Sequence, residues 1–474
     1  MRRILVSLFL GAVLSFAPCV GQVQESFFGL HQNKYKHGEP FPTVPFGVRR
    51  TVSDIVKWSD LEGCPGGPDP GNPCYHWGKN LKDGNLDKVI NDSAEHGVPV
   101  MFTFYSVPEW ASTRGPRCRA AGQPDAHCLG PADTECGGRG NLQVLGSCDP
   151  PYDLDAVMGS GEGDGSDKFF KDFVTAVATR YGKKIKYWEM WNEASNIRFG
   201  NPSNFTVKQF ARMTKDLHEV VKSINPDAVV LGANLCKCSP PGSAKFRPWT
   251  EAYFTALDKY GASAVDGISY HGYDQNSQLA EEFVGEIRDL MDKHPSTQGK
   301  AYYDTEDAWP RPLQKSDGTI DWDAESAWIA RALILHASDG SKSYIYFGWD
   351  LEGKGQMWSK EKSGGCTIPN KDGKEGYLCP TAPAYEATRS WLLGATFDKP
   401  CSSKGAEHLW TCDFTKNNGS YHGRFVWYEA GGATTNYAPE KQFARSRDLD
   451  GNATELKAKS QILLGQKPVL LEMN

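Results

Sequence analysis

The chain has 474 residues, a formal net charge of −6, 39% hydrophobic residues and 23% charged residues. This length and composition exclude a disordered polymer and leave room for one large barrel and a smaller second domain. The chain has no block of five or more like charges, so we expect neither nucleic acid nor an anionic membrane as a partner.

The first 21 residues have the pattern of a secretory signal peptide. A basic start at Arg2 and Arg3 precedes an apolar stretch over 4–17, and cleavage after Gly21 is consistent with the small residue there. The stretch is too short for a membrane span. We therefore expect a secreted protein, which would be periplasmic in a Gram-negative bacterium.

Removal of the signal peptide leaves twelve of the thirteen cysteines, an even number that indicates disulfides in an exported chain. Short spacing favours the pairs Cys64–Cys74, Cys366–Cys379 and Cys401–Cys412. The other six cysteines allow fifteen pairings, and the spacing does not choose among them. Zinc is the rival interpretation for Cys236 and Cys238, but no nearby Cys or His pair has finger-like spacing.

Short apolar runs alternate with amphipathic stretches along most of the chain, which predicts repeated βα units around a parallel sheet. The eight candidate strands are residues 27–30, 46–49, 98–104, 185–191, 229–232, 267–270, 301–305 and 344–348. The main candidate helices are residues 166–181, 206–224, 249–260, 279–294 and 323–337. Eight strands favour an α/β fold of the TIM (β/α)8 barrel type over an open doubly wound sheet.

The predicted domain order follows from changes in this pattern. The catalytic barrel is expected over 22–395, with a Cys-rich, Gly-rich loop insertion at about 114–165. Candidate strands at 409–414, 423–429 and 462–472 predict a small β-sandwich-like domain over 396–474.

Two glutamates follow candidate strands at the positions where TIM barrels hold catalytic groups. Glu193 comes after the fourth strand and is preceded by Asn192, whose amide can bind a sugar hydroxyl. Glu306 ends the seventh strand, on the opposite side of the barrel mouth. We expect the neighbouring Asp304 to point away by strand alternation and Asp307 to belong to the next loop. A facing carboxylate pair is what glycoside hydrolysis requires.

Several other residues at strand ends are candidates for binding the substrate or the nucleophile. His271 and Tyr273 follow the sixth strand and can hydrogen-bond a carboxylate. Arg50, favoured over Arg49, would place a cation beside the nucleophile. Candidate sugar platforms are Trp110 after the third strand, Trp349 after the eighth, and Trp309.

The run Tyr187-Trp188-Glu189-Met190-Trp191-Asn192-Glu193 resembles the acid/base strand of clan A glycoside hydrolases. It is most similar to family 39, which holds beta-xylosidases and exopolysaccharide hydrolases, and more loosely to families 51 and 5. The segments 104–112, 269–273 and 305–306 resemble the third, sixth and nucleophile strands of that group, and the similarity spans roughly 27–397.

The resemblance implies a retaining double displacement on an O-glycosidic bond of a poly- or oligosaccharide, with Glu193 as acid/base and Glu306 as nucleophile. It implies no cofactor. Two alternatives remain open. One is a barrel that has lost catalysis and acts as a carbohydrate-binding or adhesion protein. The other is a metal-dependent barrel hydrolase, for which His31 on the first strand lacks an adjacent His partner. Neither the sugar nor the oligomeric state follows from the sequence.

Overall fold

The computed structural model describes residues 21–32, 40–51, 57–78, 85–113, 147–195, 205–236, 246–273, 276–309, 313–351, 355–362, 364–403 and 408–473. The predicted signal peptide before Gly21 and most of the predicted insertion, residues 114–146, lie outside the described residues.

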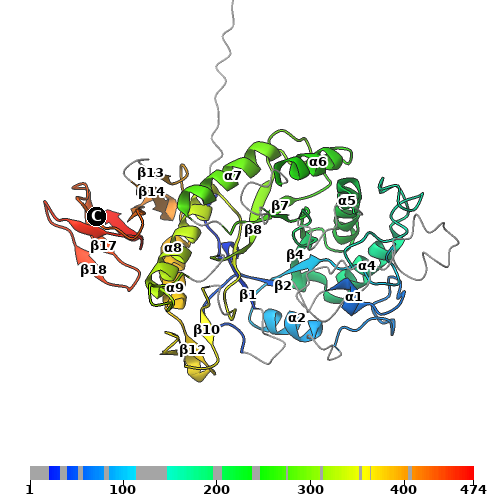
Figure 1. Cartoon of the computed structure of the whole chain (residues 1–474), viewed down its shortest axis with the longest axis horizontal. Helices are drawn as coiled ribbons and strands as arrows, with labels where there is room; N and C mark the ends of the chain where they lie inside the picture. Colours follow the sequence, from blue (N-terminus) through cyan, green and yellow to red (C-terminus); the bar gives the residue numbers. More distant parts are fainter. Residues whose placement is uncertain are drawn as a thin grey trace, which may run out of the picture.

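A closed barrel of eight parallel strands forms the centre of the molecule (Figure 1). The strands are β1 (Phe28–His31), β2 (Val48–Thr51), β3 (Val100–Phe104), β4 (Ile185–Met190), β5 (Val229–Leu231), β7 (Gly267–His271), β8 (Ala301–Asp307) and β9 (Tyr344–Tyr346). Neighbours pair in the order β5-β4-β3-β2-β1-β9-β8-β7, and a pairing of Leu231 with Gly267 joins β5 to β7. A two-residue strand, β6 (Leu235–Cys236), adds to β7 near its end. The predicted TIM barrel and all eight of its strands are confirmed.

Helices follow the strands and surround the sheet, as the predicted βα order requires (Figure 1). They are α1 (Trp58–Leu61), α2 (Leu86–Glu95), α4 (Lys168–Tyr181), α5 (Val207–Ile224), α6 (Phe246–Asp258), α7 (Ser277–Met291), α8 (Trp322–Asp339) and α9 (Thr381–Leu392). Short 3-10 turns lie at Glu25–Phe27, Gly182–Lys184, Lys371–Gly373 and Asn417–Gly419.

The start of α5 shows how the local sequence sets a helix boundary. The Thr206 hydroxyl accepts a hydrogen bond from Gln209 N, and the Gln209 side chain accepts one from Thr206 N. This reciprocal pair satisfies two backbone donors that a helix start leaves open.

The inside of the barrel is built in layers. An apolar layer is formed by Val48, Met101, Leu231, Tyr303 and Ile345, with Tyr187 packed against it. Side chains alternate along each strand, so the residue two positions further on also points inward. At that next level the inward residues are polar and include Arg50, Thr103, Glu189 and Thr305. The barrel therefore carries a buried polar layer just below its C-terminal mouth.

The C-terminal part is a β-domain that packs on α8 and α9. Its six-stranded sheet has the order β13-β14-β15-β20-β17-β18 and its two-stranded sheet pairs β16 with β19. The strands are β13 (Ser402–Ser403), β14 (Leu409–Lys416), β15 (Tyr421–Tyr428), β16 (Thr435–Tyr437), β17 (Phe443–Arg447), β18 (Ala453–Glu455), β19 (Ile462–Leu464) and β20 (Val469–Met473). One hydrophobic cluster includes residues of α8, α9 and this domain, which explains why α8 is buried almost all round.

The prediction of a single strand over 462–472 is wrong. The segment divides into β19 and β20, which belong to different sheets. Between them Gly465 lies at the break, and its carbonyl accepts a hydrogen bond from Tyr428 N. The chain crosses from one sheet to the other at this point, and alternation of side chains does not reveal such a crossing.

The three disulfides expected from short spacing, Cys64–Cys74, Cys366–Cys379 and Cys401–Cys412, are present. Cys148 and Cys236 are also disulfide-bonded. The Cys366–Cys379 bond lies in a small antiparallel sheet of β10 (Trp358–Ser359), β11 (Ile368–Pro369) and β12 (Tyr377–Leu378), in the order β10-β12-β11. Disulfides of this kind are typical of exported proteins.

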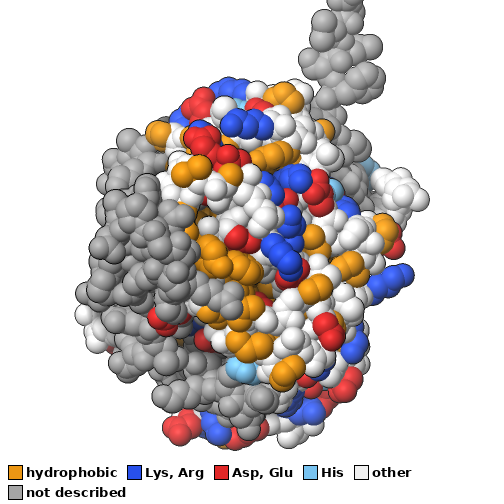
Figure 2. All heavy atoms as spheres, turned by 90° about the vertical axis from the view of Figure 1, so that its right-hand side faces the viewer, with side chains coloured by type: hydrophobic (Ala, Val, Ile, Leu, Met, Phe, Trp, Pro, Cys, Tyr) orange, Lys and Arg blue, Asp and Glu red, His pale blue; other side chains and the backbone are white. Residues whose placement is uncertain are grey.

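On the face shown in Figure 2, hydrophobic side chains gather near the centre, and side chains of both charge signs are mixed around them. Within the described ranges, no helix has the length and apolar character that crossing a membrane would need.

Candidate active site

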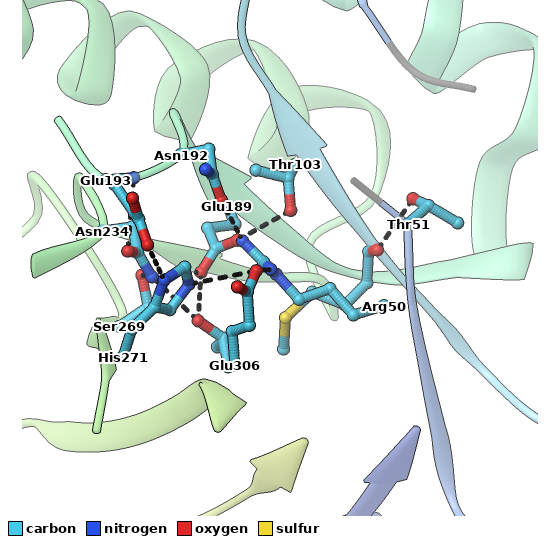
Figure 3. Close-up of polar contacts among 12 residues, drawn as sticks. Arg50, Thr51, Thr103, Glu189, Asn192, Glu193, Asn234, Ser269, His271 and Glu306 are labelled. Atoms are coloured by element: carbon cyan, nitrogen blue, oxygen red, sulfur yellow. Dashed lines mark hydrogen bonds and ion pairs between the residues drawn. The ribbon is translucent and has the colours of Figure 1, made fainter. Parts of the chain in front are cut away.

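Glu193 lies in a sharp turn directly after β4. Trp191 and Glu193 both adopt left-handed backbone conformations, with φ of 64° and 46°. Such conformations are costly for residues with a side chain and need support from their surroundings. Asn234 gives that support, because its Oδ1 accepts from Glu193 N at 3.3 Å and its backbone bonds to Met190 and Ala194. The turn brings the Glu193 carboxyl into the barrel mouth (Figure 3).

Glu306 reaches the mouth through an irregularity in β8. Tyr270 pairs with Asp304 and His271 pairs with Glu306, so Thr305 is an extra residue on one side of the ladder. Thr305 points inward to Glu189, at 2.6 Å from Oγ1 to Oε1, and Glu306 also faces the mouth. Such a bulge re-aims side chains near functional sites.

Asp304 points away from the mouth, toward His336 of α8, as expected from alternation with the inward-pointing Tyr303 and Thr305. Residues two apart on a regular strand share a face, so alternation alone would turn Glu306 away together with Asp304, and the irregularity brings Glu306 to the mouth instead. The expectation for Asp307 is wrong. Asp307 is the last residue of β8 and does not belong to the following loop.

His271 lies between the two glutamates. Its Nδ1 is 2.9 Å from Glu193 Oε1, and its Nε2 is 3.9 Å from Glu306 Oε2. The side chain is buried, and it comes from the end of β7. One imidazole ring therefore lies between Glu193 and Glu306, which were predicted to face each other across the barrel mouth (Figure 3).

Arg50 and Tyr273 both donate hydrogen bonds to Glu306. Arg50 Nη1 lies 2.6 Å from Glu306 Oε2, and the Tyr273 hydroxyl donates to Glu306 Oε1. Arg50 Nη2 also donates to Asn192 Oδ1 at 2.8 Å. A cation and a hydroxyl donor thus fix the two oxygens of the Glu306 carboxyl group.

Glu189 is a second partner of Arg50 and is completely buried. Its Oε2 accepts from Arg50 Nε at 2.9 Å and Nη2 at 2.7 Å, and from Thr103 Oγ1 at 2.7 Å. Its Oε1 accepts from Asn234 Nδ2 at 3.1 Å as well as from Thr305. Burial alone would raise the pKa of Glu189, but the Arg50 charge and these hydrogen bonds lower it.

The two groups that donate to Glu306 are held in their donor forms. Burial would lower the pKa of Arg50, yet the charges of Glu189 and Glu306 raise it. Burial and the neighbouring Glu306 and Glu193 charges raise the pKa of Tyr273 well above its usual value. The guanidinium therefore stays charged, and the phenol stays protonated, at neutral pH.

Arg49 and His31 lie close by but point to other partners. Arg49 donates to Gln32 Oε1 at 2.9 Å and to Ser93 Oγ at 3.2 Å, so the choice of Arg50 over Arg49 fits the geometry. Burial, followed by the charges of Arg50 and Arg49, holds the pKa of His31 well below its usual value. His31 is thus a neutral side chain beside Arg50.

The three tryptophans proposed as sugar platforms have other surroundings. Trp110 is half-buried, donates from Nε1 to Glu62 O at 3.0 Å and contacts Trp58 edge-on. Trp349 is completely buried and stacks on Trp358, so neither ring face is exposed. Trp309 is half-buried and packs edge-on against Trp328. The structure brings Arg50, Asn192, Glu193, His271, Tyr273 and Glu306 together. The burial of Trp349 leaves it no free ring face for a sugar, and a platform role for Trp110 and Trp309 stays a prediction.

Solved structures with a similar fold include glycoside hydrolases of clan A. A family 39 glycoside hydrolase from Bacteroides cellulosilyticus WH2 has a TM-score of 0.55 at 15% identity, covering 91% of this chain and 76% of that one. The family 30 xylanase C of Talaromyces cellulolyticus has 0.55 at 11% identity, covering 96% and 98%. The family 51 arabinofuranosidase of Xanthomonas axonopodis pv. citri has 0.54 at 12% identity, covering 96% and 98%.

The fold is that of clan A glycoside hydrolases. No protein-family model matches the sequence, and no curated protein matches it either. The predicted resemblance is therefore confirmed at the level of the fold.

Sequence reasoning missed Glu189 and Asn234, which lie beside the predicted site residues. Glu189 lies inside a strand whose other inward residue, Tyr187, belongs to the barrel core. A charged residue at an inward strand position needs a buried partner, and Arg50 holds the equivalent place on β2. The pairing of Glu189 with Arg50 could therefore have been predicted from the sequence. Asn234 follows a short strand and carries no such signal.

Among the residues that the structure describes, two groups of side chains have the composition of a metal site. Glu193, Cys236 and His271 place one ligand atom each within 4.8 Å of one another, but Cys236 is disulfide-bonded and its sulfur is not available as a thiolate. Asp304, Asp307 and His336 form the other group, buried between β8 and α8. Oxygen and imidazole ligands would suit a divalent cation such as Zn²⁺ or Mn²⁺.

Proposed function

We propose that the protein is a secreted, retaining glycoside hydrolase that cleaves O-glycosidic bonds by double displacement. The observation that carries the proposal is the pair Glu193 and Glu306 at the C-terminal ends of β4 and β8, bridged by His271. Catalytic groups of TIM barrels lie at this end of the strands. The clan A fold of the structural neighbours supports the same chemistry.

The contacts of Glu306 suit a nucleophile. Arg50 donates to one oxygen of its carboxylate and Tyr273 to the other, so the group is fixed in position and each oxygen keeps a lone pair for attack. In the first step this oxygen bonds to the anomeric carbon while the bond to the leaving oxygen breaks. The Arg50 guanidinium is then left with Glu189, which keeps the buried charge compensated.

The contacts of Glu193 suit an acid/base group. In the first step its carboxyl proton passes to the leaving oxygen. In the second step the Glu193 carboxylate takes a proton from water, whose oxygen displaces Glu306 from the anomeric carbon. His271 fixes the Glu193 side chain through Nδ1 in both steps.

Asn192 is suited to bind the sugar beside the cleaved bond. Its Oδ1 is already bound to Arg50, which orients the amide so that Nδ2 can donate to a sugar hydroxyl. A hydrogen bond there that strengthens in the transition state contributes directly to rate. The predicted signal peptide and the disulfides support secretion.

A panel of aryl glycosides and plant or microbial polysaccharides tests the proposal, with Glu306→Gln and Glu193→Gln as variants. Glu306→Gln should abolish turnover of every substrate. Glu193→Gln should stall the second step yet still react once with aryl glycosides that carry good leaving groups. Glu286→Gln, on α7 and paired with Arg247, is the matched control and should keep full activity. Normal activity in Glu306→Gln would contradict the mechanism.

The stereochemistry of the first product tests retention separately. A retaining enzyme should hold the two carboxyl groups about 5–5.5 Å apart and release a product of unchanged anomeric configuration. Proton NMR of the freshly released sugar measures this directly. Inversion would require a wider gap and would remove the nucleophile role from Glu306. Glycan binding without release of reducing sugar would support the alternative of a non-catalytic binding protein.

A further inference from the structure

A buried cluster of titratable groups lies directly behind the candidate active site, between β8 and α8. Asp304 and Asp307 place their Oδ2 atoms 3.5 Å and 3.7 Å from His336 Nε2. The other ring nitrogen of His336 is 2.9 Å from the Tyr270 hydroxyl. Burial lowers the pKa of His336 to about 3, so its imidazole is neutral at every pH at which an enzyme of this kind works.

Each aspartate of this cluster also reaches the backbone of a residue in the site. Asp307 Oδ1 accepts from Tyr273 N at 2.7 Å, and Asp304 Oδ1 accepts from Glu306 N at 3.3 Å. Tyr273 needs this support, since its φ of 54° is left-handed and costly for a residue with a side chain.

The backbone at Gly272 lies close to the side chains of both aspartates. A Cβ atom on Gly272 would come within 3.1 Å of Asp304 Oδ2 and 3.2 Å of Asp307 Oδ2. The backbone that connects His271 to Tyr273 is thus pressed against both carboxylates. A shift of Asp307 would be passed on to Tyr273, whose hydroxyl donates to Glu306.

We propose that Asp307 is a positioning residue that fixes the Tyr273 hydroxyl on Glu306 through the Tyr273 backbone. His336 lies beside both aspartates, and Asp304 accepts a hydrogen bond from the Glu306 backbone on the same side. The proposal rests on the nucleophile role proposed for Glu306. Asp307 faces away from the barrel mouth, so it has no contact with substrate and acts only through Tyr273.

A double-mutant cycle between Asp307→Ala and Tyr273→Phe tests this role. The cycle compares kcat/KM on an aryl glycoside for the wild type, both single variants and the double variant. Tyr273→Phe should lower kcat/KM about 10- to 100-fold, and Asp307→Ala about tenfold. If Asp307 acts through the Tyr273 hydroxyl, the double variant should be no slower than Tyr273→Phe alone.

Two further variants separate positioning from a general structural role. Asp307→Asn keeps an oxygen acceptor for Tyr273 N, and its amide can donate to Asp304, so it should restore activity to within about twofold of wild type. Asp339→Ala removes another buried carboxyl group, at the end of α8. Any change that it causes in kcat/KM should be the same factor in the wild type and in Tyr273→Phe. If Asp307→Ala does not fold, Asp307→Ser replaces it in the cycle.

If Asp307→Ala lowers kcat/KM by the same factor in the wild type and in Tyr273→Phe, the proposal is overturned. A crystal structure of Asp307→Ala gives a readout that needs no activity, and it should show the Tyr273 hydroxyl out of hydrogen-bonding reach of Glu306. An unchanged hydroxyl position would also overturn the proposal. A wild type that hydrolyses no glycoside would instead refute the proposed function, and the crystal structure would still decide the role of Asp307.

Discussion

Arg50 donates to Glu189 and to Glu306 at the same time, at 2.7 Å and 2.6 Å, from a side chain with no exposed surface (Figure 3). The buried Arg50 cation thus binds two carboxylates, and of these two only Glu306 reaches the mouth of the barrel. Breaking a buried pair by removing one partner leaves an uncompensated charge and is strongly destabilising. Glu189 is therefore the charge that allows Arg50 to be buried next to a nucleophile.

The first prediction concerns Glu189→Gln, which keeps the shape but removes the charge. We expect unfolding free energy to fall by about 3–5 kcal/mol at pH 7. The folded pKa of Glu189 is lowered, so its stabilisation is present above the unfolded value of about 4.3 and is lost as pH falls through the folded value. The difference in unfolding free energy between wild type and Glu189→Gln should therefore become smaller below about pH 4.

Urea unfolding at pH 7, 4 and 3 measures this gap, with Glu286→Gln as the control that should show none. A gap of constant size over this pH range would mean that the ionised form of Glu189 does not carry the stabilisation.

The second prediction concerns Asn234, which needs both an acceptor and a donor at the end of its side chain. Its Oδ1 accepts from Glu193 N, while its Nδ2 donates to Glu189 and Thr305. Asn234→Asp keeps the acceptor but places a second negative oxygen against Glu189. We expect kcat/KM at pH 7 to fall about 100-fold.

The loss in Asn234→Asp should shrink at pH 5. The repulsion and burial raise the pKa of the introduced carboxyl, and its protonated form can donate to Glu189 again. Asn234→Ala is the control, because it has no group to titrate and its loss should not depend on pH in this way. Parallel pH profiles for the two variants would argue against the donor role of Asn234.

The barrel and its mouth were predictable because they depend on local patterns. Apolar runs of strand length predicted all eight barrel strands, and residues that follow strands at the C-terminal end must share one mouth. The sequence therefore predicts one site that contains Glu193, His271, Tyr273 and Arg50, and the structure brings these four residues together.

What the sequence did not reveal depends on irregular geometry and on distant partners. The extra residue at Thr305 lets Glu306 face the mouth as Thr305 does, and no local pattern predicts it. The burial of Trp349 depends on Trp358, from a small sheet later in the chain. An aromatic residue after a strand suits either a sugar platform or a core position, and only the tertiary contacts separate the two.

The third prediction concerns Asp339 at the C-terminal end of α8. Burial is the main cause that raises its pKa to about 7, with Arg288 opposing and Glu281 adding to it. The folded state therefore binds this proton more tightly than the unfolded state, and stability should fall as pH rises from about 4 to about 7. Asp339→Asn removes this contribution.

We expect the stability advantage of Asp339→Asn over wild type to grow between pH 4 and pH 7 and to level off above pH 7, at about 1–3 kcal/mol. Chemical unfolding at four pH values measures it. Asp292→Asn, at an exposed position just after α7, is the control and should show no such trend. An advantage that is largest at pH 4 would refute the raised pKa.

The last prediction concerns the Cys401–Cys412 disulfide, which ties the segment after α9 to β14. Both cysteines belong to the hydrophobic cluster shared by α8, α9 and the β-domain, and Cys401 N donates to Ser338 Oγ of α8 at 3.1 Å. Replacing both cysteines with Ala should lower unfolding free energy by about 2–4 kcal/mol.

Because the bond lies at the junction, the loss of stability should appear first as opening of the β-domain. Limited proteolysis should then cut residues 396–474 well before the barrel. The paired variant Cys366→Ala/Cys379→Ala is the matched control, since its disulfide lies in a separate small sheet and should leave that cleavage rate unchanged. Equal cleavage rates in the two double variants would show that the Cys401–Cys412 bond does not stabilise the β-domain at its junction with α8.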